Sequence, residues 1–156
     1  MSAEDLNFLI LEQMLSLSAD EFEILVTELL TAIGFEAEHV GKTGDGGIDV
    51  QGTLRVYDFA NVDLRVQVKR YQPKSKVDKK TIKDFRGSLP EKVQAAFVTT
   101  SDFNSQARDE AEKEGYKKIG LINGQQLVEI LVTHYEDLPS EIKEKLNLHR
   151  TLIPGE

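Results

Sequence analysis

The chain has 156 residues, of which 40% are hydrophobic and 29% are charged, and its formal net charge is -8 at pH 7. This length suits one compact domain with a substantial core, and the balance of residue types is ordinary for a soluble globular protein. The absence of cysteine excludes a disulfide framework and a thiolate metal site and fits a cytoplasmic protein, and we expect neither a secretory signal nor a membrane span.

Two helices are predicted at the start of the chain. Apolar residues recur at near-helical spacing over residues 3–15. Ser18, followed three residues later by Glu21, forms a capping-box pattern, so a second helix begins near Ala19. This helix has a clean apolar stripe and ends at Gly34. The stripe consists of Phe22, Leu25, Val26, Leu29, Leu30 and Ile33.

Strands and a glycine-rich stretch follow. Residues 35–40 predict a strand, and residues 41–47 contain four glycines, whose backbone can approach a ligand closely or adopt positive φ. The stretch lacks the Gly-Lys-Ser/Thr ending of a phosphate-binding Walker loop. Residues 48–54 predict a strand with Asp49 on its polar face, and residues 57–63 predict the turn of a hairpin.

The strand after this turn carries two further polar residues of interest. Apolar and polar residues alternate over residues 64–70, which predicts a half-buried strand. Successive side chains of a strand point to opposite faces, so Gln67 and Lys69 emerge together on the polar face. If this strand pairs with the one that carries Asp49, a carboxylate, an amide and an ammonium group converge.

Such a set suits a metal and phosphate site. A carboxylate is a hard ligand for Mg2+, a lysine offsets developing negative charge or helps to deprotonate water, and Gln67 adds a neutral oxygen or orients the water. The plainer interpretation stays open, because an Asp after two glycines is often a turn residue and Gln-x-Lys on a strand is usually solvated. Asp45 is either a second acid near the metal or a turn residue. A lone histidine such as His39 is more often structural than catalytic.

Helices and short strands alternate in the second half of the chain. The chain leaves the sheet at Pro73, and a helix over residues 78–89 places Lys79, Lys83 and Arg86 on one face, where they can grip a phosphate backbone. The remaining predicted elements are a buried strand at 95–100, a helix at 105–114, a strand at 118–122, a tight turn at 123–124, helices at 125–135 and 139–146, and a loose tail at 151–156.

These elements predict an α/β fold, a central mixed β-sheet of about five strands flanked by helices on both faces. We expect residues 1–18 to form an N-terminal helical extension and residues 19–135 to form the main domain. Residues 136–156 are expected to form a C-terminal helix and tail packed on the same domain.

Charge is distributed unevenly along the chain. Residues 65–92 hold ten Lys or Arg residues against three acids, a local charge of +7, so the remaining residues carry -15. DNA binding draws much of its affinity from such basic residues, and a basic block beside the candidate site is typical of a localised phosphate-binding face. An ordinary solvated charge run has the same composition.

The motif Gly-x-Gly-Gly-Ile-Asp at residues 44–49, followed by Gln-Val-Lys-Arg at residues 67–70, resembles the signature of the Mrr-like restriction endonucleases. This branch of the PD-(D/E)xK nuclease superfamily places Gln where most members have an acid. The resemblance extends over roughly residues 20–131, with similar later strands and turns at residues 96–103 and 119–127.

The resemblance implies a restriction-endonuclease-like core and assigns roles to four residues. Asp49 and Gln67 match the metal-binding positions, with Mg2+ as the cofactor and Mn2+ as a substitute, and Lys69 matches the catalytic lysine. Glu23 falls where many members carry an additional active-site glutamate, although such a residue is otherwise simply solvated. Because Gln replaces an acid, metal binding should be weakened, which favours a single-metal mechanism at least as much as a two-metal one.

The function expected on this basis is metal-dependent cleavage of DNA phosphodiester bonds, with modification dependence as a further expectation from the branch. Arg70, Lys79, Lys83 and Arg86 would hold the DNA. One site per domain implies a homodimer or two successive nicks. The sequence contains no helix-turn-helix reader, which leaves three alternatives: a partner subunit recognises the DNA, this chain is one domain of a longer protein with its own recognition domain, or specificity is low. Two alternatives remain: a non-catalytic nucleic-acid-binding or assembly module, and a structure-specific nuclease such as a Holliday-junction resolvase.

Overall fold

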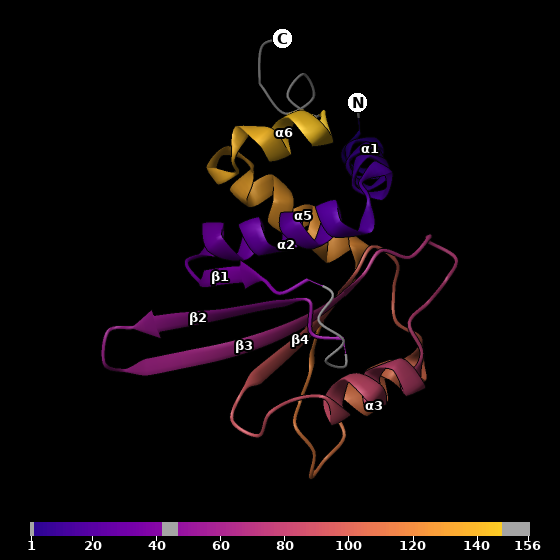
Figure 1. Ribbon diagram of the computed structural model, residues 1–156. Coiled ribbons are helices and arrows are strands. Elements are labelled where there is room, and N and C mark those ends of the chain that lie inside the picture. Colours follow the sequence, from indigo (N-terminus) through magenta and orange to yellow (C-terminus); the bar gives the residue numbers. More distant parts are fainter. Residues whose placement is uncertain (1, 42–46, 148–156) are drawn as a thin grey trace.

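The computed structural model describes residues 2–41 and 47–147 (Figure 1), so the predictions for Asp45 and for the tail at 151–156 lie outside the described residues. The helices are α1 (Ala3–Ser16), α2 (Ala19–Ile33), α3 (Lys79–Gly87), α4 (Ser105–Ala111), α5 (Gly124–His134), the short 3-10 helix η1 (Tyr135–Asp137) and α6 (Ser140–Leu146). The strands are β1 (Glu36–His39), β2 (Val50–Val56), β3 (Ala60–Lys69), β4 (Gln94–Thr99) and β5 (Gly120–Ile122).

The strands form one sheet in the order β1-β2-β3-β4-β5. The first three strands are antiparallel, whereas β3, β4 and β5 run parallel. The predicted mixed sheet of five strands is therefore confirmed. The predicted hairpin turn over residues 57–63 was too long, because β3 begins at Ala60, which pairs with Val56. Of the polar residues in that segment, Asp58 lies in the turn, whereas Asn61 and Asp63 belong to β3.

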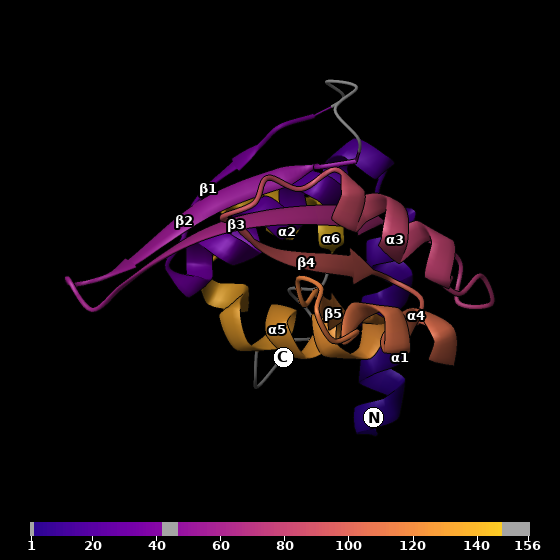
Figure 2. The same ribbon diagram turned by 90° about the horizontal axis from the view of Figure 1, so that it is seen from below.

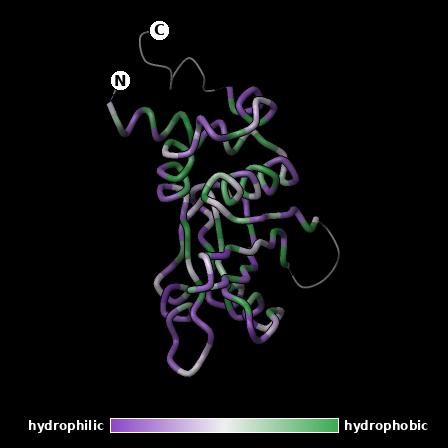
Figure 3. The backbone as a smooth tube through the Cα atoms, turned by 90° about the vertical axis from the view of Figure 1, so that its left-hand side faces the viewer, coloured by the Kyte–Doolittle hydropathy of each residue, from purple (hydrophilic) through white to green (hydrophobic). Residues whose placement is uncertain are grey.

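Helices cover both faces of the sheet, as predicted. One apolar cluster joins the sheet to α1, α2, α5 and α6, and a second cluster joins its other face to α3 and α4. Figure 1 shows the first group above the sheet and α3 below it, and Figure 2 shows the same layers from below. In Figure 3, hydrophobic and hydrophilic residues alternate along the coils at the top of the view, as expected for amphipathic helices.

The start and end of α2 follow the sequence pattern. The Ser18 hydroxyl accepts from the Glu21 N–H, the Glu21 carboxylate accepts from the Ser18 N–H, and Gly34 ends the helix with a φ of 127°. Most of the predicted apolar stripe is buried, but Ile33, the last residue of α2, is 43% exposed.

Two predicted boundaries were wrong in the C-terminal half. The helix after Asn104 ends at Ala111 and does not reach residue 114. Asn123 is the N-cap of α5 and not part of a tight turn, since its side chain accepts from the Gln126 N–H. Asn-Gly suits both a turn and a helix start, because Asn bonds readily to a nearby backbone N–H in either setting.

The terminal helices share the core of the main domain. Ile10 and Met14 of α1 and Leu146 of α6 are fully buried in the same cluster as the sheet residues. The division of the chain into extension, main domain and tail stays a prediction. Within the ranges given above, no helix is both long enough and apolar enough to cross a bilayer.

Candidate active site

Asp49 lies opposite Gln67 at one end of the β2–β3 hairpin. Val50 pairs with Val66, so the residue before Val50 faces the residue after Val66. Asp49 lies one residue outside β2 and not within it as predicted, yet its backbone is still bonded to the strands on both sides. Its N–H donates to the Val66 carbonyl and its carbonyl accepts from the Val40 N–H, both at 2.9 Å. The expected pairing of the two strands is therefore confirmed.

The Asp49 carboxylate is fixed by the backbone of the neighbouring strand. Its Oδ2 accepts from the Val68 N–H at 2.7 Å, where a backbone carbonyl would ordinarily continue the ladder. The pKa of Asp49 is raised to about 6, chiefly by burial and also by the nearby Glu23 carboxylate, against the lowering effects of the Val68 N–H, Lys69 and His39. The negative form is thus desolvated and held beside a second carboxylate, a setting that favours a cation.

Gln67 and Lys69 alternate with the core valines of β3. Val66 and Val68 are buried in the helix-covered cluster, so the two polar residues emerge on the opposite face, as predicted. Gln67 is only 8% exposed, and Lys69 is half-buried. β4 fixes their position, because Gln67 pairs with Phe97 and Lys69 with Thr99, whose hydroxyl donates to the Lys69 carbonyl at 2.8 Å.

Glu23 reaches the site from α2. It is only 8% exposed, and its Oε1 lies 2.7 Å from His39 Nε2. Asp20, one turn earlier on the same helix, places a carboxylate oxygen within 4.8 Å of both. The sequence gives no sign of this contact between His39 and Glu23, because it depends on how α2 packs against β1. Glu23 is therefore not a solvated surface residue.

Gly47 approaches Gln67 more closely than any other residue type allows. Its φ is 96°, and a Cβ atom at this position would lie 2.5 Å from Gln67 Nε2 and 2.9 Å from Gln67 Cδ. Such distances are far below van der Waals contact, so a side chain here would displace the Gln67 amide. The glycine thus leaves the space that the Gln67 amide occupies.

The structure does not bring all four candidate DNA-binding residues to an open surface. Lys79 and Lys83 are exposed on α3. The guanidinium of Arg86, in contrast, donates to the buried Glu110 carboxylate and, at 3.1 Å, to the Lys117 carbonyl. Arg70 donates to the Leu15 carbonyl at 3.0 Å. Charged groups at buried positions need partners, and these two arginines find theirs in other helices and loops of the same chain. Their guanidinium groups therefore hold parts of the protein together.

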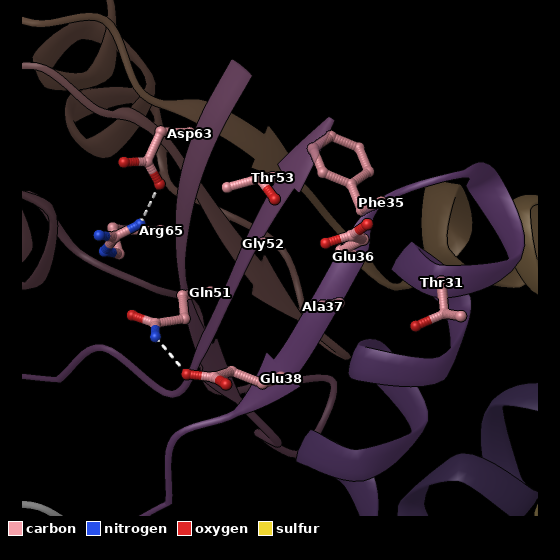
Figure 4. Close-up of a pocket in the computed structure, with 10 residues that line it drawn as sticks. All are labelled: Thr31, Phe35, Glu36, Ala37, Glu38, Gln51, Gly52, Thr53, Asp63 and Arg65. Carbon is pink, nitrogen blue, oxygen red and sulfur yellow. Dashed lines mark hydrogen bonds and ion pairs between the residues drawn. The ribbon is translucent and has the colours of Figure 1, made fainter. Parts of the chain in front are cut away.

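A groove of about 610 Å3 lies next to the site, over β1, β2 and β3 (Figure 4). Its basic and amide side chains are already paired, because Arg65 donates to Asp63 and Gln51 donates to Glu38. Glu36 adds a further acid. Although Arg65 belongs to the basic block of residues 65–92, this groove is therefore not suited to a phosphate group.

Comparison with known proteins identifies the family. The family model described as restriction endonuclease (Mrr_cat) matches residues 14–131, most of the chain. The chain belongs to the Mrr-like restriction endonuclease family.

The Mrr-like chain is 33% identical over 141 residues to the type IV methyl-directed restriction enzyme EcoKMrr of Escherichia coli strain K12. The match covers 85% of this chain but 44% of that enzyme, so the chain spans less than half of the curated relative's length.

Two solved structures share the fold. One is the MspJI restriction endonuclease in complex with a 27-mer oligonucleotide, with a TM-score of 0.73, 19% identity, and coverage of 94% of this chain and 37% of that one. The other is the DNA modification-dependent restriction endonuclease AspBHI, with a TM-score of 0.74, 20% identity, and coverage of 98% and 42%. The predicted restriction-endonuclease-like core is therefore confirmed.

The raised pKa of Asp49 predicts a pH-dependent stability of the metal-free protein. The folded chain keeps this proton up to about pH 6, whereas the unfolded chain loses it near 3.8. Between these values the folded state binds more protons, so the free energy of unfolding falls as pH rises. We expect Asp49→Asn to remove this pH-dependent loss of stability. The melting temperature of the variant should exceed that of the wild type by a difference that grows from pH 4 to 6 and is constant above pH 7.

Thermal unfolding in EDTA over this pH range measures the effect. Asp58→Asn is the matched control, because it removes a carboxylate that is 95% exposed. A difference between Asp49→Asn and wild type that does not change with pH would contradict the prediction.

Proposed function

We propose that this chain is the catalytic unit of a Mg2+-dependent endonuclease that hydrolyses DNA phosphodiester bonds, with Mn2+ as an alternative metal. The observation that carries the proposal is the meeting of Asp49, directly before β2, with Gln67 and Lys69 of the adjacent strand β3 in a restriction-endonuclease fold, with Glu23 beside them. We propose a cytoplasmic location for it.

The residues present fit a hard divalent cation. Asp49 and Glu23 supply carboxylate oxygens and Gln67 an amide oxygen, which are the donors that Mg2+ prefers, and the electrostatic repulsion between the two carboxylates is relieved by a positive charge. We propose Asp49 and Gln67 as metal ligands together with a main-chain carbonyl, and Glu23 as a residue acting through water. A bound Mg2+ lowers the pKa of water and neutralises charge on a phosphate.

Lys69 and the exposed lysines of α3 have separate roles in this proposal. Lys69 holds the attacking water and offsets the charge that develops on the phosphate oxygens. Lys79 and Lys83 contact the DNA backbone, which contributes affinity without sequence preference. Arg70 and Arg86 are not part of the proposed DNA surface, because their guanidinium groups bond within the protein.

The names of the relatives support a restriction role for the whole protein. EcoKMrr is described as methyl-directed and AspBHI as modification-dependent. We propose that this chain cuts modified DNA when a recognition domain or partner subunit delivers it. The catalytic unit itself is expected to show little sequence preference.

The test is conversion of supercoiled plasmid, methylated and unmethylated, to nicked or linear DNA in Mg2+, in Mn2+ and in EDTA. We expect metal-dependent cutting that is absent in EDTA. A four-way junction assayed in parallel tests the alternative of a structure-specific nuclease, which would cut the junction and leave the plasmid intact. No cutting of either substrate, with DNA still shifted in a gel at low salt, would favour a binding module.

Gly47→Ala should reduce cleavage by displacing the Gln67 amide. Gly115→Ala is a matched control, because Gly115 also has a positive φ, of 82°, but a Cβ atom there would meet nothing within 4 Å. Both changes should cost about 1–2 kcal/mol in unfolding free energy through backbone strain. Plasmid cleavage should fall by at least about tenfold only in Gly47→Ala, and equal cleavage by the two variants would contradict the role given to Gln67.

A further inference from the structure

The β2–β3 hairpin ends in two aromatic side chains that the described part of the chain leaves uncovered. Tyr57 is 84% exposed and Phe59 is 91% exposed. Figures 1 and 2 both show the hairpin projecting away from the helices. Tyr57 also has a φ of 49°, a left-handed conformation that residues other than glycine rarely adopt. Because these rings add nothing to the core, their position at a projecting tip is typical of a binding surface.

The charge of the tip favours a protein partner over DNA. Asp58 pairs with Arg55 at 2.7 Å, and it is the only charged residue between residues 56 and 61. A DNA-contacting tip would ordinarily carry unpaired Lys or Arg residues. In a chain with a net charge of -8, a neutral apolar patch is also where two copies can meet with little repulsion.

An apolar cleft lies at the base of the same hairpin. It has a volume of about 90 Å3 and lies between α2, α5 and the sheet. Ile33 is 43% exposed at its mouth, and Leu64 of β3 lies there too. The other partly buried residues that line it are Leu30, Ala96, Ile122 and Ile130. One chain therefore carries both an aromatic projection, the hairpin tip, and an apolar recess, the cleft.

We propose that two copies of this chain exchange hairpins, so that Phe59 and Tyr57 of each copy pack against the cleft of the other. Phe59 lies five residues before Leu64, roughly 17 Å along a strand. This span is the same in both copies. When the two hairpins lie antiparallel, a single two-fold axis therefore places the tip of each copy at the cleft of the other. Such a reciprocal contact closes the assembly at a dimer.

The face of the hairpin that would be covered is apolar along its length. Leu54 pairs with Val62, and both lie on the same face of the sheet as Leu64 and the cleft. Val56, near the tip, is 43% exposed on that face. Overlapping hairpins would bury this stripe as well as the aromatic rings.

The area available is enough for a specific dimer. An aromatic side chain buries roughly 150–250 Å2, so the four rings of two copies supply roughly 600–1,000 Å2. The apolar stripe and Ile33 of each copy bring the total to the roughly 1,200 Å2 found at the lower end of stable interfaces. The dimer extends the proposed function, because two copies carry two active sites for the two strands of a duplex.

Disulfide trapping tests the contact directly, because the chain has no cysteine of its own. Purified Phe59→Cys is mixed with tagged Ile33→Cys and oxidised, and we expect a disulfide-linked heterodimer of distinct mass. In the control, Ser105→Cys on α4 replaces Ile33→Cys, because α4 lies on the opposite face of the sheet. No heterodimer with Ile33→Cys, or equal yields with both partners, would overturn the proposal.

Sedimentation equilibrium provides a second measurement without covalent trapping. The wild type should show a monomer–dimer equilibrium in the micromolar range, and Phe59→Ser should weaken it by about tenfold or more. The change is at the exposed tip and should leave the circular dichroism spectrum unchanged. A wild type that stays monomeric throughout, or Phe59→Ser that dimerises like the wild type, would overturn the proposal.

Neither measurement contains DNA or a metal ion. Failure of the dimer would therefore leave the proposed nuclease activity standing, and loss of that activity would leave the dimer standing. If Phe59→Ser kept the sedimentation behaviour of the wild type but lost DNA affinity in a gel shift, the tip would be a DNA contact and the proposal would be wrong.

Discussion

Asp49→Asn is expected to abolish metal-dependent DNA cleavage, with a loss of at least about 10³-fold. The Asn side chain has nearly the same shape, and its carbonyl oxygen can still accept from the Val68 N–H that fixes Asp49 in the wild type. What disappears is the negative charge that attracts the cation. The loss should therefore occur without unfolding, and the variant should be more stable than the wild type above pH 6 for the reason given above.

The plasmid assay measures this loss, and a metal titration followed by calorimetry measures its cause. Asp63→Asn is the matched control, because Asp63 lies on the same hairpin but bonds to Arg65 away from the site. If the Asp49→Asn variant binds Mn2+ as tightly as the wild type, or still cuts the plasmid, Asp49 is not part of the metal site.

Lys69→Met is expected to lower the cleavage rate by about 10² to 10³-fold while leaving DNA affinity nearly unchanged. Methionine keeps most of the length and apolar stem of lysine but removes the charge. Lys69 lies at the end of β3, paired with Thr99, and its charge acts on Asp49. A group so placed should act on the reacting phosphate, whereas affinity should come from the exposed lysines of α3.

Single-turnover cleavage and a gel shift in Ca2+ separate these two effects. Lys80→Met serves as the control, because Lys80 is an exposed lysine of the same basic block that pairs with Asp84 on α3. Its cleavage rate should stay close to that of the wild type. If Lys69→Met lost affinity and kept its rate at saturating DNA, Lys69 would be a binding residue and not a catalytic one.

The sequence predicted the core of the site because the relevant signals are local. Alternation around Gln67 and Lys69 fixes the face on which they emerge, and a hairpin brings Asp49 opposite them through short-range pairing. The capping box at Ser18 likewise depends on residues three apart. The roles of these residues stay predictions, since geometry alone does not test them.

The contacts that the sequence did not predict are long-range. Arg86 of α3 bonds to Glu110 of α4, and Arg70 bonds to a backbone carbonyl at the end of α1. His39 contacts Glu23 of α2. Nothing in the spacing of these residues distinguishes a buried ion pair from a solvated charge, because their partners are brought near only by tertiary packing. For this reason the basic block of residues 65–92 looked more uniform in the sequence than it is in space.

The hydrogen bond from the Val68 N–H to Asp49 provides a spectroscopic reporter of the site. An amide proton that donates to a carboxylate resonates at a position that depends on the charge of its acceptor. Its signal in an NMR spectrum of the labelled protein should therefore follow both the titration of Asp49 and the arrival of a cation. Occupancy of the site can then be read from one backbone resonance, in the absence of substrate.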